Sequence, residues 1–156
     1  MRILLGLTVL TAGLVAAPIA AAEIVVQKSI AGVSMGVAET DVVATLGQSS
    51  DIDTGTDPIS GQPTRTLRYG KTKVTLTGGV VTLVVTTSKA QRTTDNVGIG
   101  SSEHRLRLKV KHLKCEGSGS SRFCYRGKLL PGKTVTTFSI SAKKRVKRVS
   151  VGIVVD

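Results

Sequence analysis

The two cysteines, Cys115 and Cys124, are the side chains of this sequence with the clearest covalent chemistry. An even number of cysteines in an exported chain is typical of a disulfide, and this pair would close the short loop CEGSGSSRFC. Such a loop stabilises a fold by less than the ~3 kcal/mol expected for 15 residues. A redox or metal pair is the alternative, but the spacing is not C-x-x-C and no third cysteine completes a zinc set. The sequence therefore predicts a structural Cys115–Cys124 disulfide.

His104 and His112 are the only histidines, and they lie among lysines and arginines. This setting is typical of a solvated basic face, and no acid is evidently placed to orient either histidine as a general base. The sequence contains no G-x-S-x-G elbow and no phosphate-binding loop. We therefore expect a protein that is not an enzyme, with no catalytic residues, no metal and no cofactor. A hydrolase with an unrecognised site is the alternative from another class.

The segment DIDTGTD can be compared with a calcium-binding loop, since it places Asp51, Asp53 and Asp57 at loop positions 1, 3 and 7. Gly55 occupies position 5, and Gln62 falls where a calcium loop needs a bidentate glutamate. We predict instead that DIDTGTDPISGQPTR, residues 51–65, is an irregular polar loop with Asx turns.

Charge is divided unevenly along the chain. Residues 23–100 hold seven basic and seven acidic side chains, whereas residues 101–156 hold fourteen basic and three acidic ones, a net charge of +11. Such asymmetry indicates an interaction with an anionic partner, although a face that is merely solvated is the alternative. The expected partner is an anionic envelope polymer or lipid, or a protein target, and not a specific nucleic-acid sequence. The candidate anion-binding residues are Arg105, Lys109, Lys143, Lys144, Arg145 and Lys147.

The first 22 residues have the pattern of a secretory signal peptide. Arg2 precedes an apolar run from Ile3 to about Ala17, and small residues ending in Ala22 form an A-x-A cleavage site. A membrane anchor is less favoured, because the apolar run is shorter than the roughly 20 residues that a spanning helix needs. The sequence predicts a secreted or envelope location and a mature chain of residues 23–156.

The elements that must position these residues are predicted to be two helices and two sets of strands. Acidic residues near the start and apolar spacing predict helices near residues 38–46 and 102–112. The alternation of Leu106, Leu108 and Val110 leaves a strand as the alternative for the second segment. Runs rich in valine and threonine predict strands, with Gly78-Gly79, Pro131-Gly132 and residues 142–144 as turns. The predicted strands are residues 64–70, 73–77, 80–87, 122–127, 134–140 and 146–155.

An internal repeat explains the order of these elements. At an offset of 64, Gly36 falls on Gly100 and Glu39 on Glu103. A second set, at an offset of 66, places the three residues Val80, Leu83 and Val85 on Val146, Val149 and Val151. The predicted fold class is α+β, a single domain of two tandem helix-plus-antiparallel-strand repeats that share one sheet, about 30–92 and 94–156.

The segment SMGVAETDVVATLGQSS resembles the G-M-T-x-x-x-V-x-x-x-x-G signature of two groups, the SmpA/OmlA (BamE-like) envelope lipoproteins and the β-lactamase inhibitor proteins. The matching residues are Gly36, Val42 and Gly47. The resemblance implies a tandem repeat with a shared sheet and a disulfide that follows a helix. We expect a secreted, non-enzymatic binding or envelope-associated module, and the resemblance makes a proteinaceous enzyme inhibitor the alternative.

Overall fold

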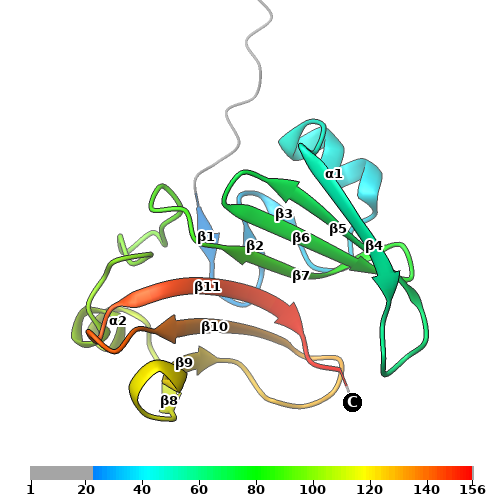
Figure 1. Ribbon diagram of the computed structural model, residues 1–156. Coiled ribbons are helices and arrows are strands. Elements are labelled where there is room, and N and C mark those ends of the chain that lie inside the picture. Colours follow the sequence, from blue (N-terminus) through cyan, green and yellow to red (C-terminus); the bar gives the residue numbers. More distant parts are fainter. Residues whose placement is uncertain (1–22, 156) are drawn as a thin grey trace, which may run out of the picture.

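The computed structural model describes residues 23–155, which form a large antiparallel sheet, a small sheet and two short α-helices (Figure 1). The predicted signal peptide, residues 1–22, lies outside the described residues. None of the helices in residues 23–155 has the length and apolar character that crossing a membrane requires. The fold class is α+β, as the sequence predicted. The elements in chain order are β1 (Ile24–Val25), β2 (Ser29–Ile30), β3 (Val33–Ser34), α1 (Glu39–Leu46), β4 (Asp51–Thr56), β5 (Pro63–Tyr69), β6 (Thr72–Thr77), β7 (Val80–Thr86), α2 (Glu103–Lys109), β8 (Lys114–Glu116), the 3₁₀ turn η1 (Gly119–Ser121), β9 (Phe123–Arg126), β10 (Thr134–Ile140) and β11 (Val146–Ile153).

The large sheet has eight strands in the order β4-β5-β6-β7-β11-β10-β9-β8, and every neighbouring pair is antiparallel. The strands before α2 form one half of the sheet, and those after α2 form the other. Strands β7 and β11 pair in the middle, where Val84 lies opposite Val151. Figure 1 shows β11 and β10 as a curved pair beneath the strands of the first half.

One face of the large sheet carries the core. Alternate residues of β6 and β10, among them Val74 and Phe138, are fully buried, as expected for strands with one face turned to the interior. Val33 from the small sheet, Val42 from α1 and Leu106 from α2 belong to the same buried cluster. The helices and the small sheet therefore cover one face of the large sheet.

Both predicted helices are present, and the second is shorter than predicted. In α1, the Asp41 carboxylate accepts the Ala38 N–H at 3.2 Å. In α2, the Ser102 hydroxyl accepts the Arg105 N–H, which is the cap expected of a serine before a helix. Helix α2 ends at Lys109 rather than at residue 112, because Val110 takes an extended backbone.

The prediction of an irregular loop over residues 51–65 is wrong for most of its length. Residues 51–56 form β4, and β5 begins at Pro63. All six residues of β4 are exposed, so this edge strand lacks the alternation of buried residues that marks a strand in a sequence. Arg68 of β5 pairs with both Asp51 and Asp53, which holds the edge strand in place. The predicted Asx turn is present at Asp57, whose carboxylate accepts the Ile59 N–H at 3.1 Å.

The burial of residues in β7 and β11 does not fit the predicted offset of 66. Val80 is 41% exposed, whereas Val146, its counterpart at that offset, is buried. An offset of 65 places the buried residues Val81 and Val84 on Val146 and Val149. The valines of β7 come in two adjacent pairs, Val80-Val81 and Val84-Val85. A shift of one residue therefore still aligns valine with valine, but it exchanges the buried face of the strand for the exposed one.

Gly36 and Gly100 make matching contacts before the two helices. The Gly36 N–H donates to the Val81 carbonyl at 2.7 Å, and the Gly100 N–H donates to the Val146 carbonyl at 2.8 Å. Their φ angles are +81° and +88°, in the region that favours glycine.

We predict that Gly36→Ala and Gly100→Ala each lower the free energy of unfolding by about 1–2 kcal/mol, because a side chain disfavours a left-handed backbone. A Cβ at either position has no atom within 4 Å, so the cost is conformational rather than steric. Urea unfolding measures it. Asparagine at the same positions should cost less, and alanine variants as stable as the parent would contradict the argument.

Candidate anion-binding groove

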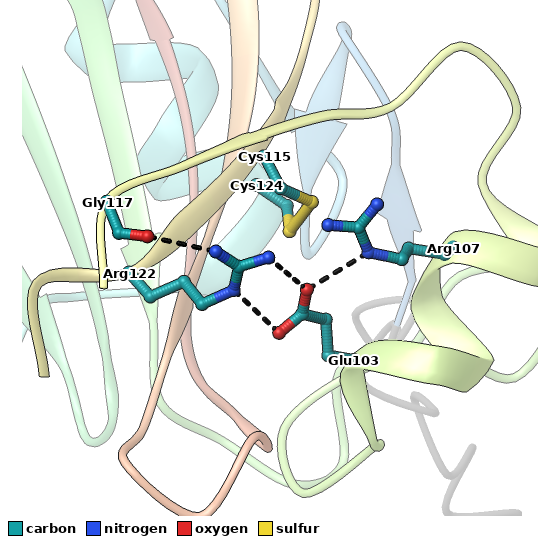
Figure 2. Close-up of a disulfide and its surroundings, with 6 residues drawn as sticks. All are labelled: Glu103, Arg107, Cys115, Gly117, Arg122 and Cys124. Carbon is teal, nitrogen blue, oxygen red and sulfur yellow. Dashed lines mark hydrogen bonds and ion pairs between the residues drawn. A yellow bond between two sulfur atoms is a disulfide. The ribbon is translucent and has the colours of Figure 1, made fainter. Parts of the chain in front are cut away.

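The Glu103 carboxylate is a buried charge that lies between two partly exposed arginines, Arg107 and Arg122 (Figure 2). Glu103 is 8% exposed, and the Arg122 guanidinium donates to both of its oxygens, at 2.8 and 2.7 Å. Arg107 donates a third bond at 3.0 Å. The hydrogen bonds from Arg122, opposed by burial and reinforced by Arg107, lower the pKa of Glu103 from its ordinary 4.5 to about 2. The carboxylate is therefore ionised at every physiological pH.

Local structure brings these three residues together. Glu103 is the first residue of α2, and Arg107 follows it by one helical turn, on the same face. Arg122 lies between η1 and β9, and its remaining Nη1 group donates to the Gly117 carbonyl at 2.9 Å. Each charged group thus has partners, which is the condition under which buried charges are tolerated.

The predicted disulfide is confirmed. Cys115 of β8 and Cys124 of β9 lie opposite each other, with an S–S bond of 2.04 Å and Cα atoms 3.9 Å apart. The bond therefore joins the edge strand β8 to its neighbour β9, rather than the end of α2 to a strand. It closes the loop that contains Gly117 and Arg122, so it restrains the loop that supplies Arg122 to Glu103.

The same residues do not make a metal site. Glu103, Cys115 and Cys124 offer ligand atoms that lie within 4.8 Å of one another. The two sulfurs are joined in the disulfide, so they are not the thiolates that bind zinc, and both carboxylate oxygens accept bonds from arginine. The cluster fits a structural role.

An open groove of about 750 Å³ lies beside this cluster. Five arginine and lysine side chains and one carboxylate line it, a formal net charge of +4. Glu103 donates its N–H to the Lys144 carbonyl at 2.9 Å, which attaches the turn between β10 and β11 to the start of α2. The lining residues are Ser102, Glu103, His104, Arg107, Ser118, Gly119, Arg122, Lys143, Lys144 and Arg145.

The structure divides the six candidate anion-binding residues. Lys143, Lys144 and Arg145 lie together in the groove. The other three lie elsewhere: Arg105 and Lys109 line two other cavities, and the Lys147 ammonium donates to the Ser120 carbonyl at 2.9 Å.

Arg107 and Arg122 line the groove and were missed as site residues. Arg107 had a signal in the sequence, because it follows Glu103 by four residues, the spacing of a helical ion pair. Arg122 had none, because it is 19 residues from Glu103 and only the packing of the loop beside α2 brings the two together.

The comparisons with known proteins concern the fold. No protein-family model matches the chain, and no curated protein matches it in sequence. A solved extracellular protein of Bacillus anthracis that contains an SCP domain matches with a TM-score of 0.51 and 10% identity, over 76% of this chain and 44% of that one. A cysteine-rich secretory protein of Staphylococcus aureus matches with a TM-score of 0.45 and 9% identity, over 76% and 44%. A DUF4309 family protein (YjgB) of Bacillus subtilis matches with a TM-score of 0.44 and 10% identity, over 80% and 84%.

These findings overturn the resemblance to the SmpA/OmlA lipoproteins and the β-lactamase inhibitors. The solved structure that shares the fold, the Bacillus anthracis protein, is of another kind, and the chain spans 44% of its length. The three matching residues have local roles that explain the error. Gly36 takes a positive φ before α1, Val42 is its buried residue, and the Gly47 N–H closes its last turn. These roles follow from the local backbone and packing of α1, so the three residues do not by themselves indicate a family.

The sequence predicts a secreted location, and the Bacillus anthracis protein that shares the fold is itself described as extracellular.

We predict that Glu103→Gln lowers the free energy of unfolding at pH 7 by about 1.5–3 kcal/mol, because hydrogen bonds to charged groups are lost. Since the pKa of Glu103 is lower in the folded state than its ordinary 4.5, the stability it contributes is fully present above pH 4.5. That contribution declines as the pH falls through about 2. Urea unfolding of both proteins across this range should show the two curves converge in acid. A difference that does not change with pH would contradict the ionised cluster.

We predict that replacing both Cys115 and Cys124 with alanine destabilises the protein by about 2–3 kcal/mol, since the disulfide closes a short loop. The variant should also lose part of the acid-dependent stability that Glu103 provides, because Arg122 is less restrained. Urea unfolding at pH 7 and pH 3 measures both effects. Free thiols in the unreduced, secreted protein would contradict the disulfide itself.

Proposed function

We propose that this protein is a secreted, non-enzymatic binding module of the extracellular space or cell envelope, and that its basic groove binds an anionic polymer. The observation that carries the proposal is the lining of the groove, where the lysines Lys143 and Lys144 lie near Glu103. Glu103 is the one carboxylate of this lining, and its ion pairs with Arg107 and Arg122 neutralise it. A groove lined in this way attracts repeated anionic groups.

The cations of the groove differ in how much of their bonding capacity is used. Arg122 donates to Glu103 and to Gly117, and Arg145 donates to the Gly100 carbonyl at 2.9 Å. Arg107 uses its Nε group on Glu103, and its two terminal amino groups are left for a ligand. Lys143 and Lys144 extend from an exposed turn. We assign ligand contact to Arg107, Lys143 and Lys144, and a positioning role to Arg122.

The composition of the groove favours a polymer over the other anionic partners. Among the described residues that line it, none has an aliphatic hydrocarbon side chain, and the imidazole of His104 is the single aromatic ring. A lipid surface needs apolar groups that enter the membrane, and single-stranded nucleic acid needs aromatic platforms on which bases stack. A chain of phosphates, sulfates or carboxylates needs only the cations.

We also propose that residues 23–156 form one unit of two related halves, as the internal repeat suggested. The matching bonds of Gly36 and Gly100 support this. The register between β6 and β7 shifts at Thr75/Leu76, and the register between β10 and β11 shifts at Ser139/Ile140, 64 residues later. The strand order also supports it, because the strands of each half follow chain order from the edge of the sheet to its centre. They run from β4 to β7 on one side and from β8 to β11 on the other.

We predict that Lys143→Glu combined with Lys144→Glu weakens binding to soluble polyphosphate at least about tenfold, since two attractions of up to about 1 kcal/mol each become repulsions. Binding by the parent should weaken as salt is raised, because salt screens exposed charges beyond about 8 Å at physiological ionic strength. Isothermal titration at two salt concentrations measures both effects.

Lys71→Glu combined with Lys73→Glu is the matched control, because it changes the net charge equally on exposed residues of the first half. The control should bind nearly as well as the parent. Equal losses in the two double variants would show that only net charge matters, and no loss in the groove variant would remove the groove as the binding site.

A further inference from the structure

The loop between β9 and β10, residues 127–133, holds two exposed leucines at its tip. Its sequence is GKLLPGK, and Leu129 and Leu130 are each 53% exposed. Single exposed apolar side chains are ordinary on a protein surface. Two adjacent leucines on a protruding loop, with lysines on both sides, form an apolar projection with a basic rim.

The C-terminal segment braces this loop. The Gly132 N–H donates to the Val154 carbonyl at 2.9 Å, and the Val154 N–H donates to the Lys133 carbonyl at 2.9 Å. Within the loop, the Lys133 N–H donates to the Leu130 carbonyl at 3.1 Å. The leucines are therefore presented on a fixed turn, and little conformational entropy is lost when a partner covers them.

An open cavity of about 380 Å³ lies beside the leucines. Lys128, Lys133, Thr134 and Gln27 line it. Two ammonium groups and a threonine hydroxyl at one cavity suit a phosphate-type anion. The loop thus combines an apolar tip with an adjacent site for an anionic group.

We propose that this loop docks the protein on an anionic lipid surface, with Leu129 and Leu130 entering the boundary of the acyl chains and with Lys128 and Lys133 contacting headgroup phosphates. A soluble polyanion would use the lysines and leave both leucines in water. A second copy of the chain fits less well, because a symmetric contact through this loop would bring like charges of the two copies together. The proposal does not depend on the basic groove, which lies at the other end of β10.

The absence of tryptophan from the sequence allows a direct test of insertion. Leu129→Trp places one fluorophore at the tip, and Leu108→Trp places one on the exposed outer face of α2, at a residue that is 68% exposed. The processed, secreted protein is mixed with vesicles of phosphatidylcholine, with or without phosphatidylglycerol. We expect a blue shift and quenching by brominated acyl chains for Leu129→Trp with anionic vesicles only, and neither change for Leu108→Trp.

Vesicle sedimentation then separates the two parts of the site. Leu129→Ser combined with Leu130→Ser keeps the charge and should weaken binding at least about tenfold, because the buried apolar area is lost. Lys128→Gln combined with Lys133→Gln should weaken it about 25-fold, since each lysine near an anionic surface contributes a factor of about five. Leu108→Ser and the Lys143→Glu, Lys144→Glu variant should change binding much less.

Three results would overturn the proposal. The first is vesicle binding by the double serine variant equal to that of the parent, with thermal unfolding confirming that both are folded. The second is a loss of binding caused by the groove variant alone. The third is a dimer of the parent that the double serine variant converts to monomer, because the leucines would then serve self-association.

Discussion

The pairing of β7 with β11 is the interaction on which the rest of the structure depends. Four residue pairs, from Leu83–Gly152 to Thr86–Val149, join the two halves of the large sheet. The buried side chains of both halves belong to one cluster, so each half completes the core of the other. Gly152 lies where the strands approach closely, and a Cβ there would stand 2.9 Å from the Leu83 side chain. The ladder therefore fixes α2, the basic groove and the leucine loop in one frame with the first half.

The charge of the second half has a structural part and an uncompensated part. Glu103 pairs with Arg107 and Arg122, so those two guanidinium groups are stabilised near the disulfide rather than repelling each other. The turn of Lys143 and Lys144 is attached to α2 through backbone hydrogen bonds, such as that from Glu103 to Lys144, which need no particular side chain at residues 143 and 144. Arginines that build the cluster and lysines that add charge thus meet in one groove. Their different roles explain why a single carboxylate can order the groove without cancelling its charge.

Local signals decided how much of this could be predicted from the sequence. Helix α1, helix α2 and the Gly78-Gly79 hairpin follow from caps, apolar spacing and turn residues within a few positions of each other, and all are present. The strands β1 to β3 have only two residues each, and β4 is wholly exposed, so neither group carries the periodic pattern that marks a strand. Three cations that line the groove, Lys143, Lys144 and Arg145, were named from the sequence because they are contiguous in it. Arg122 reaches Glu103 only through tertiary packing, which periodicity does not encode.

The geometry of β10 relates the two proposed binding surfaces. The leucine loop precedes β10 and the turn of Lys143 and Lys144 follows it, so the seven residues of the strand separate them. Seven residues of strand span about 23 Å, which is well beyond the ~8 Å over which exposed charges interact at physiological salt. Occupation of one surface therefore has little direct electrostatic effect on the other. A rigid strand between them also fixes their directions. In the proposed arrangement, a loop that enters a lipid surface holds the basic groove at the far end of β10, away from the headgroups, where an extended anionic polymer of the envelope can reach it.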